Sequence, residues 1–516
     1  MSGPPLTTAR RLLRDHGLLL AIVTLAISVR ALAFGSIPSG LNQDEAATGY
    51  DAFALLHFGI DRNGFHNPAV MVAWGSGMSA LPEYLAMLSF ALFGFSVASL
   101  RAVNLVFAIF GLLAFYATVR RSERRRLALL CVFLLAICPW HVMMSRWGHE
   151  ANLLPSLFMV ATYFLARGTE HRWSFLLSAV LFALCLYAYA PAYAAVPVFA
   201  VSAVVYLRAT RSISWAWVLQ ASALFCLVAS PILLFLVINQ LKLDSIRTSF
   251  LSIPRLSSPP RYQTMSSVFG GELFRRSAEN LWALARLLFT QNDGQIYNAL
   301  PGYGVVYPFG MPLAVVGLAL TLRDFAKGKR DAVFVFLWLS AALVLAALEP
   351  VNINRINLIF FPIVFFVAVG VDQVAKRCSV LFAILSLHLV AFAAFSLTYF
   401  GALATAKALA FSPGFAEAIH AASATPGKIC LSAEQPYMLV LFYEATDANT
   451  FVRTVVYEEP GAEFRSVRSF DRYVFGLKHC QGNPEVSAYV VGRGQEHQFV
   501  GWNIRFFESI AVATRP

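Results

Sequence analysis

Long runs of hydrophobic residues, separated by short polar segments, fill this chain as far as about residue 400. Most runs approach the roughly 20 residues with which an α-helix crosses the hydrocarbon core of a bilayer. The pattern predicts about eleven membrane-spanning helices. They are expected at residues 18–34, 97–118, 127–144, 152–166, 175–190, 192–207, 217–238, 305–322, 333–348, 356–371 and 380–400. A shorter run at 81–95 contains Pro82 and Glu83, and we expect it to lie in the membrane interface.

The pattern changes after residue 400, where charged residues become more frequent and no long apolar run follows. Short segments rich in β-forming residues predict strands at 428–432, 450–457, 486–491 and 504–512, with a helix at 435–445. We therefore expect a transmembrane domain at 1–400 and a small α/β domain at 401–516. Cys430 and Cys480 both belong to the second part. Whether they form a disulfide is left open, because spacing alone cannot show that two sulfur atoms meet.

Composition and charge favour a membrane protein with a defined orientation. Of the 516 residues, 58% are hydrophobic and 13% are charged, about half the charged share of soluble domains. The net charge of +12 arises from Lys and Arg in short clusters between the apolar runs, as the positive-inside rule produces, so nucleic-acid binding is not expected. If Arg10, Arg11 and Arg14 are cytoplasmic, every cluster between spans falls on that side. The loops at about 35–97 and 239–303 and the C-terminal domain are then expected outside.

Two adjacent carboxylates, Asp44 and Glu45, follow the first apolar run. Ionisable groups at a membrane boundary are costly and usually functional. Asp44 is therefore a candidate general base, which accepts a proton from an attacking hydroxyl or amine. Glu45 is expected to orient groups beside it. The structural alternative is that Asp44 only caps a helix beginning at Glu45.

The same topology brings further polar residues to the outer side. Glu150 joins Asp44 and Glu45 as a candidate catalytic carboxylate, and Arg355 and Arg146 are candidates for holding a phosphate group. For a single arginine, contact with lipid headgroups is the alternative. Candidate substrate-binding residues complete the outer set: Asp61, His66 and Tyr303. A glycine-rich nucleotide loop is absent from the sequence, so the activated donor is expected to be a lipid.

These residues resemble a known family. Residues 41–50, then Gly59-Ile60-Asp61, Pro68, Pro82, Phe93-Gly94-Phe95-Ser96 and Leu100-Arg101 resemble the first outer loop of GT-C fold glycosyltransferases of family 39. That family includes protein O-mannosyltransferases and the lipid A aminoarabinose transferase. Ser145-Arg146 with Glu150 resembles its second outer turn.

The resemblance implies the GT-C fold, a polyprenyl-phosphate-sugar donor, and inverting transfer on the outer face with Asp44 as general base. No cofactor is expected to be required, and a divalent metal is left open but not indicated. The C-terminal domain is short and does not resemble the sugar-binding domains of eukaryotic O-mannosyltransferases. A bacterial inner-membrane enzyme is therefore expected.

The sequence thus predicts a hexosyl- or pentosyltransferase that acts on a glycan, lipid or protein of the cell envelope. Two alternatives stay open at this point. A ligase or polymerase of lipid-linked glycans would share the fold, and a multi-span transporter would share the helices. The charged residues gather at one face rather than within the spans, whereas a transport path needs polar groups near the midplane, so the transporter is less favoured.

Overall fold

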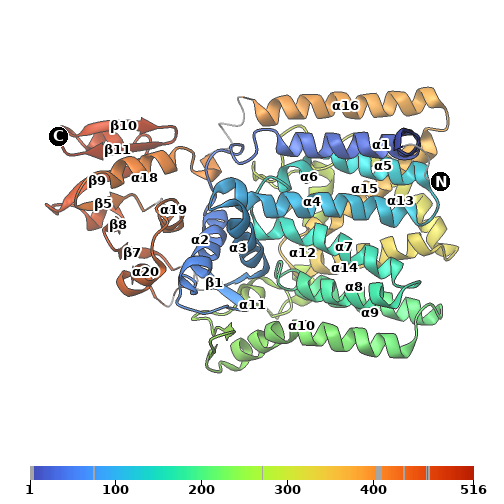
Figure 1. The fold of residues 1–516 in the computed structure, drawn as a ribbon, viewed down its shortest axis with the longest axis horizontal. Helices are drawn as coiled ribbons and strands as arrows, with labels where there is room; N and C mark the ends of the chain where they lie inside the picture. The colour runs from blue at the N-terminus through green and yellow to red at the C-terminus, as the bar shows by residue number, and fades with distance from the viewer. Residues whose placement is uncertain are drawn as a thin grey trace.

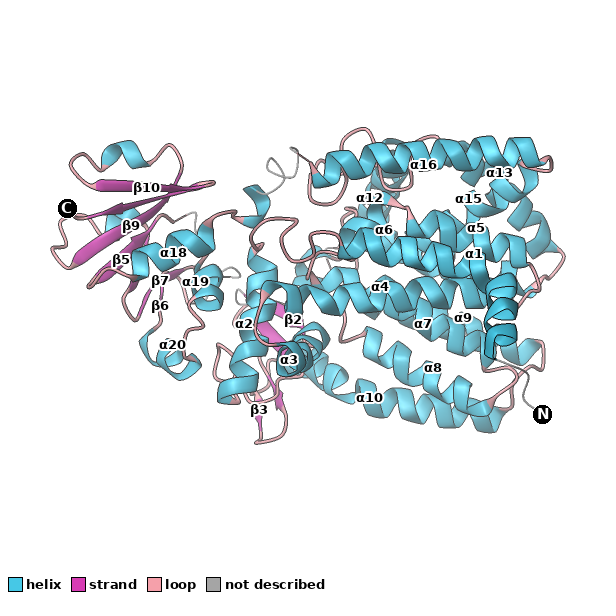
Figure 2. Ribbon diagram, turned by 45° about the horizontal axis from the view of Figure 1, so that its top comes forward, coloured by secondary structure: helices cyan, strands magenta, loops and turns pink. Residues whose placement is uncertain are grey.

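Apolar helices run side by side through one half of the molecule, and a sheet with short helices forms the other half (Figure 1). The computed structural model describes residues 5–73, 76–269, 271–401, 409–433, 436–460, 462 and 465–516. Figure 2 shows the larger sheet confined to the part that follows the last long helix. The expected division at residues 400 and 401 stays a prediction, although the last long helix does end at Phe400.

Each segment that was expected to cross a membrane overlaps a helix. These helices are α1 (Pro5–Ala31), α4 (Val97–Arg120), α5 (Arg125–Ala136) with α6 (Pro139–Met144), α7 (Leu153–Arg167), α8 (Arg172–Cys185), α9 (Ala192–Ala209), α10 (Trp215–Leu241), α13 (Gly310–Ala326), α14 (Arg330–Leu348), α15 (Phe360–Val374) and α16 (Cys378–Phe400). Within the described ranges, 5 helices are long and apolar enough to cross a membrane by themselves. The number of about eleven spans stays a prediction.

The outside of the helix bundle is apolar, as a lipid environment requires. Leu227 is 70% exposed, Phe382 75% and Leu397 79%. In water such a surface would be an aggregation liability, whereas in a bilayer it faces hydrocarbon. The protein is therefore an integral membrane protein.

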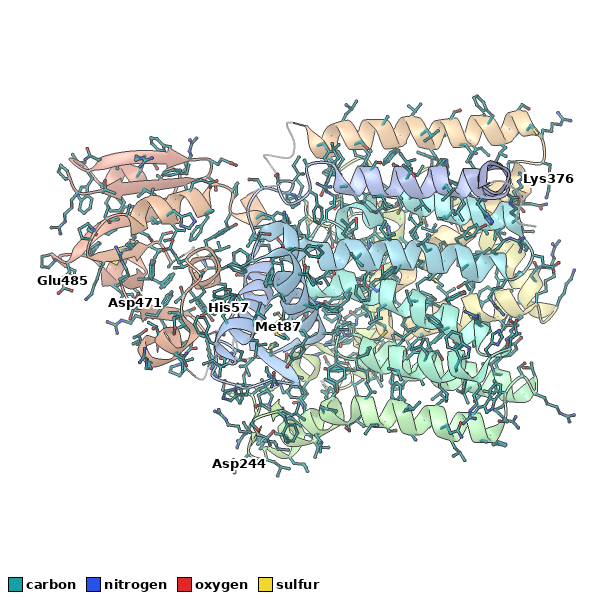
Figure 3. All side chains as sticks on the ribbon, viewed as in Figure 1. His57, Met87, Asp244, Lys376, Asp471 and Glu485 are labelled. Carbon is teal, nitrogen blue, oxygen red and sulfur yellow. A yellow bond between two sulfur atoms is a disulfide. The ribbon has the colours of Figure 1, made fainter. Side chains whose placement is uncertain are left out.

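The two ends of the bundle differ in charge. The connections after α4, α13 and α15 carry the basic clusters at residues 120–126, 323–330 and 376–377. We call this the basic end. Figure 3 labels Lys376 there, and Figure 1 marks the N-terminus at the same end. The opposite end, which adjoins the C-terminal sheet and the loop with Asp244, is called the domain end (Figure 3).

Short elements gather at the domain end. They are α2 (Gln43–Phe58), β1 (Val70–Ala73), β2 (Ser76–Ser79), α3 (Leu81–Phe93), η1 (Glu150–Asn152), β3 (Ile246–Arg247), β4 (Ser252–Ile253), α11 (Arg261–Met265), α12 (Leu273–Thr290) and η2 (Asn357–Ile359). The run at 81–95 forms α3, which lies beside α2 outside the bundle (Figures 1 and 2). This position agrees with the expectation that residues 81–95 do not cross the membrane.

The N-terminus of α2 is capped by Asn42. Its side-chain oxygen accepts hydrogen bonds from the backbone N–H groups of Asp44 and Glu45 at 2.7 and 3.3 Å. Glu45 accepts in return from the Asn42 N–H at 3.3 Å, which completes a capping box. The alternative left open for Asp44, that it is the N-cap of this helix, does not agree with the structure, in which Asn42 is the N-cap.

The C-terminal part is built on one mixed sheet in the order β10-β11-β9-β5-β8-β7-β6. Its strands are β5 (Lys428–Leu431), β6 (Val456–Tyr457), β7 (Val467–Phe470), β8 (Tyr473–Phe475), β9 (Val486–Gly492), β10 (Asn503–Phe507) and β11 (Ile510–Thr514), and its helices are η3 (Leu409–Phe411), α18 (Phe415–Ser423), α19 (Tyr437–Tyr443), α20 (Ala448–Thr454), η4 (Leu477–His479) and η5 (Glu496–Gln498). Only the pairs of β5 with β8 and β9 are parallel.

Several expectations for this part are corrected. Most of 450–457 is helix α20, because Asp447 accepts a hydrogen bond from the Thr450 N–H at 2.7 Å and caps a helix that buries Phe451. Residues 504–512 form a hairpin of two strands rather than one strand. Strands β7 and β8 were not expected. The helix expected at 435–445 is α19, with Gln435 outside the described residues. Cys430 and Cys480 form a disulfide.

Helix α2 and the C-terminal part share one hydrophobic core. The Tyr50 hydroxyl donates to the Thr446 carbonyl at 3.0 Å. The rings of Phe95 and Phe442 lie 4.5 Å apart. The helix that carries Asp44 is thus packed between the bundle and the C-terminal part.

Candidate active site

A cavity of about 350 Å³ lies at the domain end of the bundle. Asp44 reaches it from the first turn of α2, Glu150 from η1, and Arg355 from the loop after α14. The structure thus brings together three residues that the sequence analysis singled out. The other lining residues are Asn42, Gln43, Ala73, Gly77, Met78, Trp147, His149, Tyr189, Ala190, Pro191, Met265, Tyr297, Glu349, Asn352 and Asn354.

Asp44 faces a histidine that the sequence analysis did not select. Oδ2 of Asp44 lies 3.6 Å from Nε2 of His149, and the two side chains are 33% and 13% exposed. Nδ1 of His149 accepts a hydrogen bond from the Ala151 N–H at 3.0 Å. The proton of the neutral ring is therefore on Nε2, where it points toward the carboxylate.

Burial and the neighbouring carboxylates shift the pKa of His149 in opposite directions. Burial disfavours the charged imidazole, but the carboxylates of Asp44, Glu150 and Glu45 outweigh burial and raise the pKa of His149 above its ordinary value. A second proton would have to displace the Ala151 N–H from Nδ1, so the hydrogen bonds described here are those of the neutral ring. Protonation of His149, which the nearby carboxylates favour, would turn the two side chains into an ion pair.

Glu150 is the second carboxyl group of the cavity. Its Oε2 accepts a hydrogen bond from the Ser79 backbone N–H at 2.8 Å. Burial raises the pKa of Glu150, and the nearby Asp44 carboxylate adds to the effect, whereas His149 opposes it. Glu150 thus retains a proton to higher pH than an exposed glutamate, which suits a group that donates a hydrogen bond to substrate.

Arg355 supplies the positive charge of the cavity. Its backbone N–H donates to Asn352 Oδ1 at 2.8 Å, and its guanidinium makes only a long bond of 3.5 Å to the Pro350 carbonyl. No carboxylate among the described residues lies within ion-pair distance of this guanidinium. A guanidinium that lacks an anionic partner inside a cavity is suited to an anionic ligand such as a phosphate.

Glu45 lies outside the cavity, although it follows Asp44 directly. Its carboxylate forms a fully buried ion pair with Arg101, at 2.8 Å to Nε and 3.0 Å to Nη2. It also accepts from the Gly148 N–H at 2.7 Å. Glu45 therefore ties the start of α2 to α4 and to the segment before His149. This position indicates a structural role that holds Asp44 and His149 in place.

Arg146 also lies outside the cavity. Its guanidinium donates to the carbonyls of Val29, Arg30, Ala33 and Ile37 at the end of α1, and it lies 4.9 Å from the centre of the Phe400 ring. These partners leave little of the guanidinium for a phosphate. Arg146 fixes the end of α1, because carbonyls at a helix end lack partners within the helix.

The three candidate substrate-binding residues do not line the cavity. Asp61 is fully buried and accepts from the N–H groups of Asn63 and Phe65, both at 2.8 Å. His66 bonds to the Gly59 carbonyl at 2.8 Å. The Tyr303 hydroxyl lies 2.8 Å from Thr398 Oγ1 on α16.

Sequence reasoning missed most of the polar lining of the cavity. His149 adjoins Glu150, and Asn352 and Asn354 adjoin Arg355. Proximity in sequence to a selected residue, in the same turn at the domain end, was a usable signal for these three. Tyr189 and Tyr297 come from other loops, and their sequence context carried no such signal. Within the part of the chain that the structure describes, no group of three or more His, Cys, Asp or Glu side chains is arranged to hold a metal ion.

Comparison with known proteins bears on the fold. Residues 79–235 match the family model of dolichyl-phosphate-mannose-protein mannosyltransferases. The structure resembles ArnT of Cupriavidus metallidurans bound to undecaprenyl phosphate, with 12% identity over 96% of this chain and 98% of that chain and a TM-score of 0.58. The chain has the GT-C fold. The resemblance to GT-C proteins that the sequence indicated is thereby confirmed.

Two further structures resemble this GT-C protein. ArnT of the same organism in the apo state has 11% identity over 97% of this chain and 98% of that chain, with a TM-score of 0.57. The Archaeoglobus fulgidus oligosaccharyltransferase in complex with zinc and sulfate has 12% identity over 92% of this chain and 68% of that chain, with a TM-score of 0.53. No curated protein sequence matches the chain.

Proposed function

We propose that this GT-C protein is a membrane glycosyltransferase that moves a sugar from a polyprenyl-phosphate-linked donor to a glycan, lipid or protein of the cell envelope. The observation that carries the proposal is the cavity at the domain end, which both Asp44 and Arg355 line. A carboxylate base and a guanidinium that has no anionic partner among the described residues are the two groups that displacement of a phosphate requires. Further support comes from the similar ArnT structure, which holds undecaprenyl phosphate.

The chemistry follows from these two groups. Asp44 accepts the proton of an acceptor hydroxyl or amine while the acceptor oxygen or nitrogen forms a bond to the anomeric carbon. The bond between that carbon and the phosphate oxygen breaks, and the phosphate leaves with the electron pair. Arg355 offsets the charge that develops on the phosphate. A single displacement of this kind inverts the configuration at the anomeric carbon.

His149 and Glu150 assist in this scheme. The Nε2 proton of His149 points at Asp44 and orients the carboxylate toward the acceptor. Glu150, with its raised pKa, donates a hydrogen bond to a sugar hydroxyl. No step requires a metal ion, so we expect turnover to survive treatment with a chelator.

The orientation proposed for the molecule puts the cavity on the outer face of a bacterial inner membrane. The basic clusters at residues 120–126, 323–330 and 376–377 lie at the basic end, which the positive-inside rule assigns to the cytoplasm together with the N-terminus. Arg275 and Arg276 of α12, at the domain end, are the exception. The Cys430–Cys480 disulfide in the C-terminal domain suits an oxidising compartment. An alkaline phosphatase fused after Pro516 should be active, and one inserted at Lys327 should be inactive. The reverse pattern would contradict this orientation.

The proposed activity is tested with the purified protein. We expect transfer or slow hydrolysis of sugar from a polyprenyl phosphate, and no reaction with nucleotide sugars. Mass analysis of envelope glycans from cells with and without the gene should then reveal the sugar and acceptor. Transfer of a preassembled oligosaccharide would support the ligase alternative, for which the likeness to an oligosaccharyltransferase is the specific observation. Movement of a sugar lipid across the membrane without covalent transfer would contradict both.

A further inference from the structure

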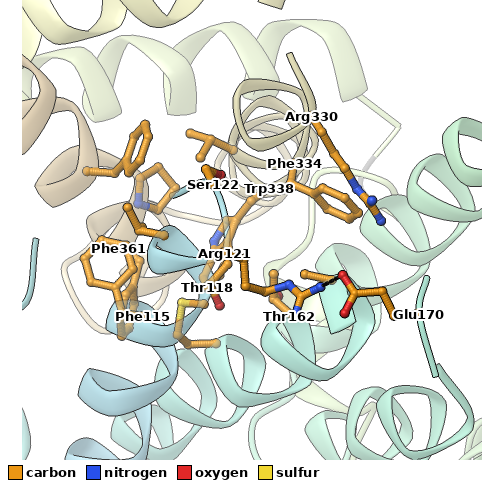
Figure 4. Close-up of a pocket in the computed structure, with 16 residues that line it drawn as sticks. Phe115, Thr118, Arg121, Ser122, Thr162, Glu170, Arg330, Phe334, Trp338 and Phe361 are labelled. Carbon is orange, nitrogen blue, oxygen red and sulfur yellow. Dashed lines mark hydrogen bonds and ion pairs between the residues drawn. The ribbon is translucent and has the colours of Figure 1, made fainter. Parts of the chain in front are cut away.

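A second cavity, of about 170 Å³, lies at the basic end, between α4, α7, α14 and α15 (Figure 4). It is separate from the candidate active site at the other end of the same helices, and none of its lining residues was assigned a role above. They are Phe115, Thr118, Val119, Arg121, Ser122, Met159, Thr162, Ala166, Glu170, Arg330, Phe334, Val335, Trp338, Phe361, Pro362 and Phe365.

The wall of this cavity is apolar. Aromatic rings of Phe115, Trp338 and Phe361 form much of it. The hydroxyls of Thr118 and Thr162 do not make it polar, because each donates to a carbonyl of its own helix, at 2.7 and 2.8 Å. A dry apolar cavity of comparable size binds small apolar groups. The space therefore suits a segment of hydrocarbon chain.

Two arginines lie on one side of the cavity, at the ends of their helices. Arg121 is the C-cap residue of α4, and Arg330 is the first residue of α14. Arg121 donates to the Glu170 carboxylate. Arg330 lies 5.9 Å from the centre of the Phe334 ring, and its guanidinium makes no hydrogen bond to any other described residue. Figure 4 shows both guanidinium groups on the side of Glu170, away from Phe115 and Phe361.

We infer that this cavity binds an anionic phospholipid, with part of one acyl chain against Trp338 and the phosphate at Arg330 and Arg121. Among the described residues that line the cavity, the two arginines exceed the single carboxylate by one positive charge, so the side with the arginines is complementary to an anion. Helix ends lie at the level of lipid headgroups, and basic pockets between transmembrane helices on the cytoplasmic side are suited to anionic headgroups. An apolar wall next to such a pocket matches an amphiphile better than a free anion.

The test uses the full-length protein in detergent and phosphatidylglycerol with brominated acyl chains. Bromine quenches tryptophan fluorescence on contact, and the difference between wild type and Trp338→Phe isolates the signal of Trp338. We expect saturable quenching of Trp338 that unbrominated phosphatidylglycerol reverses. Brominated phosphatidylcholine should quench Trp338 far less. The two lipids are compared on the wild-type protein, and Trp338→Phe serves only to assign the quenched signal to Trp338.

A variant that removes one positive charge provides the second part of the test. Arg330→Gln should weaken binding of the brominated phosphatidylglycerol about fivefold, the usual effect of one basic residue near an anionic headgroup. Lys327→Gln is the matched control, since Lys327 is an exposed cation at the same end that does not line the cavity. Equal quenching by the two lipids, or equal binding by Arg330→Gln and Lys327→Gln, would overturn the inference. Preferential quenching by a brominated polyprenyl phosphate would also overturn it.

Discussion

Nε2 of His149 lies 3.6 Å from Oδ2 of Asp44, and both side chains line the same cavity. The neighbouring carboxylate of Glu45 is instead buried against Arg101. Two consecutive acidic residues therefore sit in opposite environments, because successive side chains of a helix point in directions about 100° apart. Because their environments differ, we expect substitutions of Asp44 and Glu45 to have different effects.

Asp44→Asn should lower turnover by about 10²–10⁴-fold, the usual contribution of a general base, because asparagine keeps the size of the side chain but cannot accept the proton. The melting temperature should stay close to that of the wild type, since Asn42 rather than Asp44 caps α2. Initial rates with a polyprenyl-phosphate sugar measure the effect. Asp471→Asn, an exposed residue of the C-terminal sheet (Figure 3), is the matched control. Near-normal turnover in Asp44→Asn would remove Asp44 from the mechanism.

Glu45→Gln should destabilise the protein, because it leaves the buried Arg101 guanidinium without its counter-ion. Breaking a buried ion pair from one side costs about 3–5 kcal/mol. Thermal unfolding in detergent should show a clear drop in the melting temperature. Glu83→Gln is the contrasting control: this carboxyl group is buried without a hydrogen-bond partner among the described residues, and burial raises its pKa well above the ordinary value. A neutral amide should be tolerated there. Equal stability of both variants would refute the assignment.

Arg355→Ala should weaken use of the lipid donor. A hydrogen bond to a charged group contributes about 1.5–3 kcal/mol, which corresponds to about a 10- to 150-fold loss in kcat/KM for the donor. Arg275→Ala is the control, because Arg275 is an exposed residue of α12 that pairs with Glu272 and Glu279. The rate at low donor concentration is the measurement. If both variants match the wild type there, Arg355 does not hold the phosphate.

Asp61 should make stability depend on pH. Burial, with the nearby Asp51 carboxylate, raises the pKa of Asp61 from 3.8 to about 7. A carboxyl group whose pKa is raised by folding binds its proton more tightly in the folded state, so its contribution to stability is complete below about 3.8 and is lost as the pH rises through about 7. Melting temperatures between pH 4 and pH 8, roughly this window, should therefore fall less steeply in Asp61→Asn. Asp244→Asn, in an exposed loop, should follow the wild type. Parallel curves for the wild type and Asp61→Asn would contradict the prediction.

Gly49→Ala should loosen the contact between α2 and the C-terminal domain. A Cβ atom at position 49 would lie 2.5 Å from a ring carbon of Phe442, and that ring is held against Phe95. Overpacking of this kind costs about 1–3 kcal/mol, more than the helix propensity that alanine gains. Thermal unfolding should show the loss. Gly17→Ala, where nothing lies within 4 Å, should not lower the melting temperature.

The helices of the bundle were predictable because most apolar runs approach the length that a bilayer requires. The C-terminal sheet was harder. Residues 450–457 are rich in β-branched residues, and this composition favoured a strand. The Asp447 cap and the burial of Phe451 stabilise a helix there instead. Local propensity over so short a segment is a weak guide when tertiary contacts oppose it.

The site was predictable only in part, for a related reason. Asp44, Glu150 and Arg355, which the sequence analysis assigned to one side of the membrane, line one cavity in the structure. Arg146 carries the same charge as Arg355 and was assigned to the same side of the membrane. Its guanidinium, however, donates hydrogen bonds to carbonyl groups just after the end of α1. Sequence shows where a charge lies along the chain, whereas its availability depends on backbone groups that only the folded structure places beside it.

The shared core of α2 and the C-terminal domain has a consequence for biogenesis. The Tyr50 hydroxyl bonds to the Thr446 carbonyl, 396 residues farther along the chain. At about 5–20 residues per second, a ribosome needs roughly 20–80 s to cover that interval. Throughout this time the apolar face of α2 stays uncovered on one side of the membrane while translation continues. Asp44 at its first turn is thus fixed among the last events of folding, and a nascent chain stalled before residue 437 should be a substrate for quality-control proteases rather than a slow enzyme.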